Sequence, residues 1–396
     1  MDVRARHGRL SRRNAVKPIL AIFAAVVSVA LVSTGSVAAI ALWQLSGTLE
    51  DGVSIEAVGE APPTVGPITG PVNILVVGSD SGGGNANYGV RGEDLNDVTI
   101  LVHISPVTHT AIAVSFQRDM YVPIAGCKGG SPGTRKINEA LTYGGLACAV
   151  STVESLTGLN IGYAAKVEFD GVVRMSNAVG GVEVCVAEPI HDLQINFDLE
   201  AGKHTLKGGD ALNFLRSRHG VGDGSDTTRV SNQQLFLSAL MRKIKSEGTL
   251  GNPLTVYSLA AAALKNMQLS TSLSSLDTMA SMGLAVKDIP LKNIAFVAYP
   301  GGAGELNGVG GVIPNIASAQ VLIDAIKKDK RVVVTAGGGG VVGGDDVQET
   351  PSGSPSDPSA APTIAPPETE VDTVKLPGNI TGQNATEQTC TNGNTF

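Results

Sequence analysis

The sequence lacks the short motifs by which several common kinds of site are identified. The glycine-rich segment S-G-G-G-N at residues 81–85 is not a P-loop, because no G-x-x-x-x-G-K-[ST] pattern with its lysine and hydroxyl is present. The four cysteines form no C-x-x-C pair, so neither a zinc site nor a dithiol redox motif is indicated. The chemistry of this chain must therefore be sought in its charged residues.

The chain also lacks a general excess of positive charge. Its net charge is −7, yet the first 17 residues hold six basic residues and one acidic residue. This segment is at +5, which leaves −12 for the remaining chain. A chain that is acidic beyond its N-terminus does not have the basic face of a nucleic-acid-binding domain, so we expect no nucleic acid partner.

A long uncharged segment follows the basic residues 1–17. Residues 18–43 carry no charged side chain, and as a helix rising ~1.5 Å per residue they exceed the ~30 Å hydrocarbon core of a bilayer. The alternative is a cleaved signal peptide, but the segment is longer than its ~7–15-residue core. Because basic residues stay on the cytoplasmic side, we expect a single-pass protein of the cell membrane with an extracytoplasmic C-terminal part.

The remaining chain divides by composition. Residues 44–71 predict a stalk, and residues 72–335 predict one folded domain. The Gly-rich and then Pro- and Ser-rich residues 336–372 are typical of a linker. Residues 373–396 are either a small ordered segment or a tail.

The predicted domain alternates strands and helices. Apolar, β-branched runs at 72–78, 97–104 and 110–116 predict buried strands, and later helical patterns alternate with the strand-like runs 294–299 and 331–335. This alternation predicts a layered α/β/α domain. The close spacing of the first strands predicts a mixed central sheet.

Two helix ends carry local signals. Residues 148–158 predict a helix that ends at Gly158, a residue suited to the left-handed conformation found there. A long helical pattern begins after residue 225, with Asp226 available as its N-cap.

Two acidic residues flank the first two predicted strands. Asp80 follows the first strand and Asp97 opens the second, so both carboxylates reach one edge of the sheet if the intervening loop folds back. Mg²⁺ prefers one or two carboxylates together with waters and substrate phosphates. The alternative is that both residues stabilise turns, as aspartate commonly does.

Arginines gather at the ends of the predicted elements. Arg118 ends the third strand, Arg216 and Arg218 follow an apolar helix face, and Arg229 lies in the first turn of the next helix. Singly, each is ordinarily a solvated surface charge. A cation at a helix N-terminus is mildly disfavoured, however, so Arg229 is better explained by a nearby anion. Guanidinium groups match phosphate oxygens, so together these residues predict a pyrophosphate site.

The cysteines fall in the expected extracytoplasmic part, where disulfides persist. Cys127 and Cys148 bracket one short segment, and a bridge between them would add roughly 3 kcal/mol in the loop-closure model. The sequence leaves the partners of Cys185 and Cys390 open.

The order of the motifs resembles that of the LytR-CpsA-Psr family of cell-wall ligases, in its actinobacterial form. The segments that carry the resemblance span about residues 72–335 and are N-I-L-V-V-G-S-D, L-N-D-V-T-I-L-V-H-I, V-S-F-Q-R-D-M-Y-V-P-I, K-I-N-E-A, L-T-G-L-N-I, F-D-G-V-V-R, V-G-G-V-E-V, D-A-L-N-F-L-R-S-R-H and D-T-T-R-V-S-N-Q-Q. Any one of these motifs is weak evidence, but nine in consistent order are specific.

The resemblance implies an enzyme that joins a polyprenyl-pyrophosphate-linked glycopolymer, such as arabinogalactan or teichoic acid, to peptidoglycan through a phosphodiester. It implies that Mg²⁺ is bound by Asp80 and Asp97, and that Asp119 holds Arg118 or its neighbours in place. Asp226 would position an arginine or the incoming hydroxyl group. The pyrophosphate would be gripped by Arg118, Arg216, Arg218 and Arg229.

The chain departs from the family pattern at two positions. Members often carry an arginine two residues after the first-strand aspartate, where this chain has Gly82, and Arg91 is a possible substitute from the same loop. The usual proline before the R-D pair is Gln117.

Two other functions remain open from the sequence. The same residues could serve a pyrophosphatase that gives the lipid phosphate to water, or a non-catalytic envelope protein that binds the lipid.

Overall fold

The computed structural model describes residues 52–53, 55, 68–80, 94–124, 127, 133–245, 259, 263, 267–274, 276–343 and 372–394. The predicted membrane-spanning segment 18–43, the basic residues 1–17, Gly82 and Arg91 lie outside these residues. Within the described ranges, no helix is both long and apolar enough to cross a membrane.

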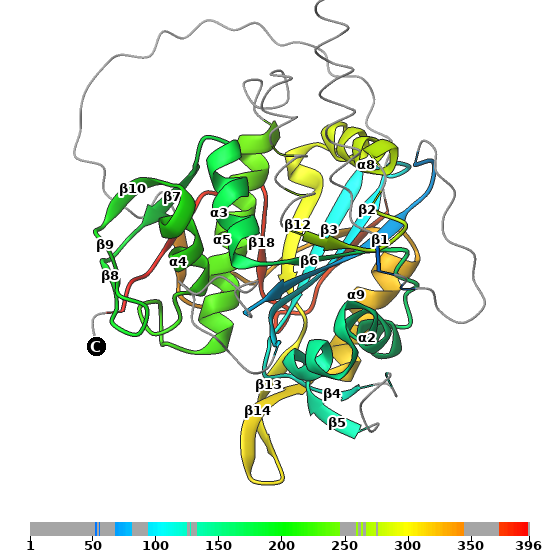
Figure 1. The fold of residues 1–396 in the computed structure, drawn as a ribbon, viewed down its shortest axis with the longest axis horizontal. Coiled ribbons are helices and arrows are strands. Elements are labelled where there is room, and N and C mark those ends of the chain that lie inside the picture. Colours follow the sequence, from blue (N-terminus) through cyan, green and yellow to red (C-terminus); the bar gives the residue numbers. More distant parts are fainter. Residues whose placement is uncertain are drawn as a thin grey trace, which may run out of the picture. The chain divides into compact units, whose positions relative to one another are not determined.

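A seven-stranded mixed sheet forms the centre of the domain (Figure 1). In the sheet, β1, β2 and β3 are antiparallel neighbours, while β6 joins β1 and β12 joins β3 in parallel. The predicted mixed α/β architecture is therefore confirmed. The strands lie in the order β11 (Met267–Leu269), β6 (Tyr163–Val167), β1 (Val72–Ser79), β2 (Asn96–Ser105), β3 (Thr110–Phe116), β12 (Ile294–Ala298) and β18 (Gly382–Asn384).

The central strands form because their side chains are apolar on both faces. Every residue of β3 is buried, and its sequence T-A-I-A-V-S-F has no charge that would have to be desolvated. Helices α2 (Ala140–Thr157) and α9 (Ile316–Lys327) supply the core on one face of the sheet. Helices α5 (Asp226–Lys245) and α8 (Leu276–Lys287) contact the other face (Figure 1).

The helix predicted at 148–158 is the second half of α2. The chain is already helical from Ala140, but Gly144 and Gly145 leave helical geometry, with φ values of 176° and 63°, and divide the helix. Gly158 ends it as predicted: its φ is 64°, and its N–H donates to the carbonyl of Glu154.

A second, smaller sheet lies beside α5. Its core joins Phe214 of α4 (Gly208–Arg216) to Phe236 of α5, with ring centroids 6.1 Å apart. Helix α3 (Phe169–Ala178) packs on α4. The strands of this sheet lie in the order β10 (Gly202–Leu206), β7 (Val182–Val186), β19 (Thr389–Thr391) and β16 (Val341–Gly343).

Short elements complete the described domain. They are the strand pairs β4 (Tyr121–Ile124) with β5 (Gly133–Lys136), β8 (Ile190–Asp192) with β9 (Phe197–Leu199), β13 (Gly301–Leu306) with β14 (Val309–Pro314) and β15 (Arg331–Val333) with β17 (Thr373–Lys375), and the 3₁₀ helices Ile137–Glu139 and Leu291–Asn293.

The C-terminal residues are ordered rather than extended from the domain. Between residues 372 and 394, β17 pairs with β15, β18 forms an edge of the central sheet, and β19 lies inside the second sheet. Of the two possibilities left open for this segment, the ordered one is what the structure contains. The predicted strand at 331–335 is β15, which lies outside the central sheet.

Two disulfides link the described cysteines. Cys127 and Cys148 are bonded, as predicted. Cys185 of β7 is bonded to Cys390 of β19, which lies opposite it in the parallel register. The partner of Cys185 therefore comes from the C-terminal segment.

Candidate functional site

A cavity of about 390 Å³ lies between the central sheet and helices α3, α4 and α5. Most of its wall is apolar, with side chains from all four of these elements. The apolar lining residues include Val76, Val98, Ile100, Phe169, Val172, Met175, Leu212, Leu215, Phe236, Leu237 and Leu240.

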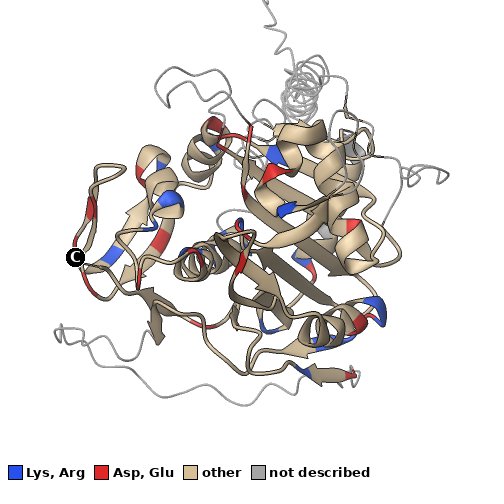
Figure 2. Cartoon of the chain, turned by 90° about the horizontal axis from the view of Figure 1, so that it is seen from below, with Lys and Arg blue, Asp and Glu red and all other residues tan. Residues whose placement is uncertain are grey.

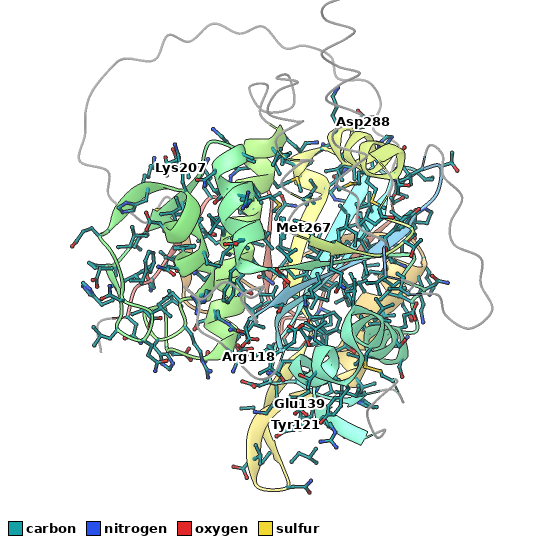
Figure 3. The ribbon with its side chains drawn as sticks, viewed as in Figure 1. Arg118, Tyr121, Glu139, Lys207, Met267 and Asp288 are labelled. Atoms are coloured by element: carbon teal, nitrogen blue, oxygen red, sulfur yellow. A yellow bond between two sulfur atoms is a disulfide. The ribbon has the colours of Figure 1, made fainter. Side chains whose placement is uncertain are left out.

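One part of the cavity wall is strongly charged. Arg118, Arg216, Arg218 and Arg229, the four predicted arginines, all line the cavity, together with Asp97. They come from the end of β3, the end of α4, the following turn and the first turn of α5. Figure 3 shows Arg118 beside the lower end of α5, and Figure 2 shows basic and acidic residues interspersed over the described elements. The fold thus brings four segments that are distant in the sequence to the wall of one cavity.

Arg118 is held by acidic neighbours. Its Nη1 donates to Oδ1 of Asp97 at 2.5 Å, and its Nε lies 3.8 Å from Oδ1 of Asp119. The backbone N–H of Arg118 donates to Oδ2 of Asp226 at 3.1 Å. Burial disfavours the charged guanidinium, but the carboxylates of Asp97, Asp119 and Asp226 outweigh burial and raise the pKa of Arg118. The side chain is therefore cationic throughout the physiological pH range.

Asp226 joins Arg118 to Arg229. Its Oδ1 lies 2.5 Å from Nη2 of Arg229, and the same nitrogen donates to the backbone carbonyl of Asp97 at 3.2 Å. The prediction that Asp226 caps α5 is wrong, because Asp226 is the first helical residue and its carboxylate contacts these arginines. Instead, the hydroxyl of Ser225 accepts from the N–H of Thr228 at 3.3 Å.

Arg216 and Arg218 are fixed by different contacts. The guanidinium carbon of Arg216 lies 4.5 Å from the ring centroid of Phe169, so a cation stands at the boundary with the apolar wall. Nε of Arg218 donates to the carbonyl of Gly224 at 3.1 Å.

The predicted acidic residues take different positions. Asp97 lines the cavity, whereas Asp80 and Asp119 do not. Asp80 is buried, and its Oδ1 accepts from the N–H of Leu95 at 3.1 Å. Asp119 contacts Lys136, whose Nζ lies 3.2 Å from its Oδ1. The structure therefore does not bring the carboxylates of Asp80 and Asp97 together in the cavity wall.

The donor set can be compared with what a metal ion requires. Among the described residues, no group of three or more His, Cys, Asp or Glu side chains is placed to hold a metal. Mg²⁺ is nevertheless often bound by one carboxylate, waters and substrate phosphates, and Asp97 offers such a carboxylate beside the arginines. The residues fit a metal that arrives with a phosphate ligand, and they do not form a closed protein site.

Several lining residues were not predicted from the sequence. They are Asp192 of β8, Glu168 and Gln233 of α5, while His219, which follows Arg218 in the sequence, lines the cavity as well. Gln233 has a local signal, since it lies four residues after Arg229 and so shares its helix face. Asp192 has none, because its cavity position depends on a hairpin that forms far from the arginines in sequence.

Comparisons with known proteins agree with this architecture. Residues 50–328 match the model of the LytR_cpsA_psr family. The probable cell wall biosynthesis protein LcpB of Corynebacterium glutamicum is 35% identical over 218 residues, which cover 53% of this chain and 51% of that protein. The polyisoprenyl-teichoic acid–peptidoglycan teichoic acid transferase TagU of Bacillus cereus is 31% identical over 236 residues, which cover 58% of this chain and 69% of that protein.

A solved structure has the same fold. Protein gbs0355 of Streptococcus agalactiae superposes with a TM-score of 0.57 at 27% identity, covering 66% of this chain and 90% of that chain. The chain spans only about half to three fifths of the length of four curated relatives, with 51%, 61%, 51% and 56% of each covered.

Proposed function

Because this chain belongs to the LytR-CpsA-Psr family, we propose that it transfers a glycopolymer from a polyprenyl-pyrophosphate carrier to peptidoglycan through a phosphodiester bond. The observation that carries the proposal is the single cavity in which Arg118, Arg216, Arg218 and Arg229 adjoin an apolar wall. A polyprenyl pyrophosphate matches both parts of this cavity. Its dianionic or trianionic head is complementary to the arginines, and its hydrocarbon chain is complementary to the apolar wall.

The arginines would bind the two phosphates. Nε of Arg118 and Nε of Arg229 are buried and have no hydrogen-bond acceptor within the described part of the chain. An anion in the cavity would offset these uncompensated donors. Asp97, Asp119 and Asp226 keep the guanidinium groups in place before the substrate arrives, so little reorganisation is needed during the reaction.

The apolar wall would hold the start of the polyprenyl chain. A volume of about 390 Å³ lies in the lower part of the ~300–1,000 Å³ range of small-ligand sites, so it encloses only part of a long polyprenyl chain. The rest of such a chain is best accommodated by a bilayer. This agrees with our proposal that residues 18–43 anchor the protein in the cell membrane with the domain on the extracytoplasmic side.

In the proposed reaction a hydroxyl oxygen of peptidoglycan attacks the phosphorus that carries the glycopolymer. The new P–O bond forms, the bond from this phosphorus to the bridging oxygen breaks, polyprenyl phosphate leaves with that oxygen, and the hydroxyl proton passes to solvent. The arginines stabilise the charge that develops on the phosphoryl oxygens and on the leaving phosphate. Mg²⁺, with Asp97 as its protein ligand, would supply further neutralisation of the phosphate charge.

The test is a transfer assay with the full chain in detergent. Incubation with a lipid-linked glycopolymer and peptidoglycan is expected to yield muropeptides that carry the polymer, and Arg118→Ala should lower the yield by roughly 100-fold because a phosphate-binding cation is lost. The control is Arg331→Ala, on the edge strand β15 outside the cavity.

Each alternative has its own outcome in this assay. Release of polymer phosphate to water without modified muropeptides would replace the proposal with a pyrophosphatase. Lipid binding that is weakened by Arg118→Ala, with no turnover in the parent chain, would replace it with a binding protein.

A further inference from the structure

Asp192 is the most heavily hydrogen-bonded carboxylate among the described residues that line the cavity. It ends β8, and only 2% of its surface is exposed. Its Oδ2 accepts from the hydroxyl of Ser217 at 2.9 Å and from the backbone N–H groups of Arg218, His219 and Gly220 at 3.1, 3.2 and 3.3 Å. One buried oxygen therefore accepts hydrogen bonds from four consecutive residues, 217–220.

The other oxygen ties the carboxylate to its own hairpin. Oδ1 of Asp192 accepts from the N–H of Gln194 at 3.2 Å. Burial alone would raise the pKa of Asp192, but the hydrogen bonds from Ser217, Arg218, Gly220 and Gln194 outweigh burial and lower it. The group is thus an anion at neutral pH, with its charge balanced by the donors around it.

The turn that Asp192 holds follows one of the cavity arginines and contains another. It begins directly after Arg216, the last residue of α4, and it contains Arg218. At its far end the side chain of Arg218 donates to the carbonyl of Gly224. The backbone from which both side chains extend is therefore held by a short segment in which the N–H of Arg218 has Asp192 as its acceptor.

The C-terminal segment holds the same turn from the other side. The N–H of Gly222 donates to the carbonyl of Asn392 at 2.9 Å, and the N–H of Asn394 donates to the carbonyl of Gly220 at 2.8 Å. The turn is thus fixed at both ends, and Asp192 is the carboxylate that accepts from the N–H groups of residues 218–220.

We propose that Asp192 is a positioning residue that presents Arg216 and Arg218 to the pyrophosphate of the lipid substrate. The role rests on the proposed function, because it specifies how the arginines of the same cavity are aimed. Asp192 does not itself contact phosphate in this role, since an anion would repel it. Its carboxylate accepts hydrogen bonds from the N–H groups of the turn. A charged acceptor binds these donors more strongly than a neutral side chain of the same size.

The variant that tests this role is Asp192→Asn, which keeps the shape of the side chain and removes its charge. An amide offers one accepting oxygen, and its NH₂ group would face donors of the turn or of Gln194. The matched control is Asp198→Asn on the neighbouring strand β9, where an exposed carboxylate contacts His191 at 2.8 Å. Ser217→Ala is a milder variant that removes one donor and keeps the carboxylate.

The measurement is the affinity of the full chain in detergent for geranylgeranyl pyrophosphate. It is determined by titration calorimetry at a temperature where each variant is folded. Asp192→Asn is expected to weaken binding by roughly 10-fold, because small displacements of positioned groups carry costs of this order or more. Ser217→Ala should cause a smaller loss in the same direction, and Asp198→Asn should match the parent chain.

Two further readouts separate positioning from loss of fold. In an Arg218→Ala background, Asp192→Asn should have a much smaller effect on binding, because part of what it positions is absent. Amide hydrogen exchange should accelerate at residues 218–220 in Asp192→Asn and not in Asp198→Asn.

The outcomes that would overturn the proposal are distinct from failure of the proposed function. A parent chain that does not bind geranylgeranyl pyrophosphate would overturn the proposed function itself. Unchanged affinity in Asp192→Asn, or equal losses with and without Arg218, would overturn only the role of Asp192.

Discussion

At the scale of single residues, two of the cavity arginines are paired with carboxylates in the protein alone. Arg118 contacts Asp97 and Asp119, and Arg229 contacts Asp226. A guanidinium as buried as that of Arg229, which is 6% exposed, would cost several kcal/mol without a partner, so Asp226 makes its burial compatible with folding. The carboxylates also fix the donors in the direction of the cavity.

Replacing Asp97 should affect catalysis more than stability. In Asp97→Ala we expect turnover in the presence of Mg²⁺ to fall by roughly 100-fold, because the proposed metal ligand and the partner of Arg118 are both lost. The side chains of this pair are 24% and 27% exposed, so the pair contributes about 1 kcal/mol or less to folding. Turnover and melting temperature should be compared with those of Asp324→Ala, a half-buried carboxylate on α9 outside the cavity, which accepts from Gln320. Parallel losses of both quantities would contradict the assigned role.

His103 should make the free energy of unfolding depend on pH. Burial disfavours the imidazolium and lowers the pKa of His103 below its ordinary 6.5, although Asp329 opposes the shift. The unfolded chain therefore binds a proton more readily than the folded one, and stability should fall as pH drops below about 6.5, by at most about 1.4 kcal/mol per pH unit. Urea unfolding at pH 7.5 and 5.5 tests this, with His103→Gln expected to reduce the dependence and the exposed His191→Gln expected to keep it.

At the scale of elements, helix ends depend on single backbone positions. Gly158 closes α2 in the left-handed region at φ 64°, where a Cβ atom is strained. Gly283 lies in the interior of α8, and a Cβ atom there meets nothing within 4 Å. The same substitution should therefore have opposite effects at the two positions.

Gly158→Ala should destabilise the protein by roughly 1–2 kcal/mol, because an L-residue is forced into the left-handed region. Gly283→Ala should stabilise it by up to about 1 kcal/mol, since alanine favours the helix and restricts the unfolded chain. Chemical denaturation of both variants checks the sign and the size. A stabilising Gly158→Ala would contradict the assigned cap.

Local sequence patterns suffice for the central strands and not for the edge of the sheet. The runs at 72–78, 97–104 and 110–116 were predictable because continuous apolar, β-branched residues have few other uses. The strand G-Q-N of β18 was not, because it is three polar residues long and forms only by pairing with β12. Strand formation there is a property of the assembled sheet.

The candidate site divides in the same way. The arginines were predictable because their residue type and their places at element ends suggest an anion site. Asp80 is buried outside the cavity wall, and Asp192 acts as an acceptor, because each bonds to backbone N–H groups. Every residue except proline carries such a group, so no sequence pattern marks these contacts. Ser225 and Asp226 are both good N-cap residues. Ser225 caps α5, and the carboxylate of Asp226 contacts Arg229 instead.

At the scale of the whole molecule, the two disulfides close loops of very different length. The bonded cysteines are separated by 21 residues in one case and by 205 in the other. In the loop-closure model the first restricts the unfolded chain by roughly 3 kcal/mol and the second by roughly 5 kcal/mol. The Cys185–Cys390 disulfide also joins β7 to the C-terminal segment whose residues 392–394 contact the turn at 220–222.

Removing the longer link should therefore cost more in both stability and binding. We expect the Cys185→Ser, Cys390→Ser double variant to lose more free energy of unfolding than Cys127→Ser, Cys148→Ser, by about 2 kcal/mol. Only the former should also weaken binding of geranylgeranyl pyrophosphate, because residues 392–394 contact the turn at 220–222. Denaturant titrations under oxidising conditions, together with calorimetry, check both expectations. Equal losses of affinity for geranylgeranyl pyrophosphate in the two double variants would contradict the coupling between the longer disulfide and the turn.

The position of β19 between β7 and β16 has a consequence for biogenesis. At ~5–20 residues per second, the ribosome needs about 10–40 s to extend the nascent polypeptide across the 205 positions from Cys185 to Cys390. Cys127 and Cys148 emerge earlier and can be oxidised together at once, whereas Cys185 must stay reduced and unmatched throughout that delay. For the proposed extracytoplasmic domain, pairing of these cysteines would therefore call for a thiol oxidant that acts slowly, or for an isomerase that repairs premature cross-links.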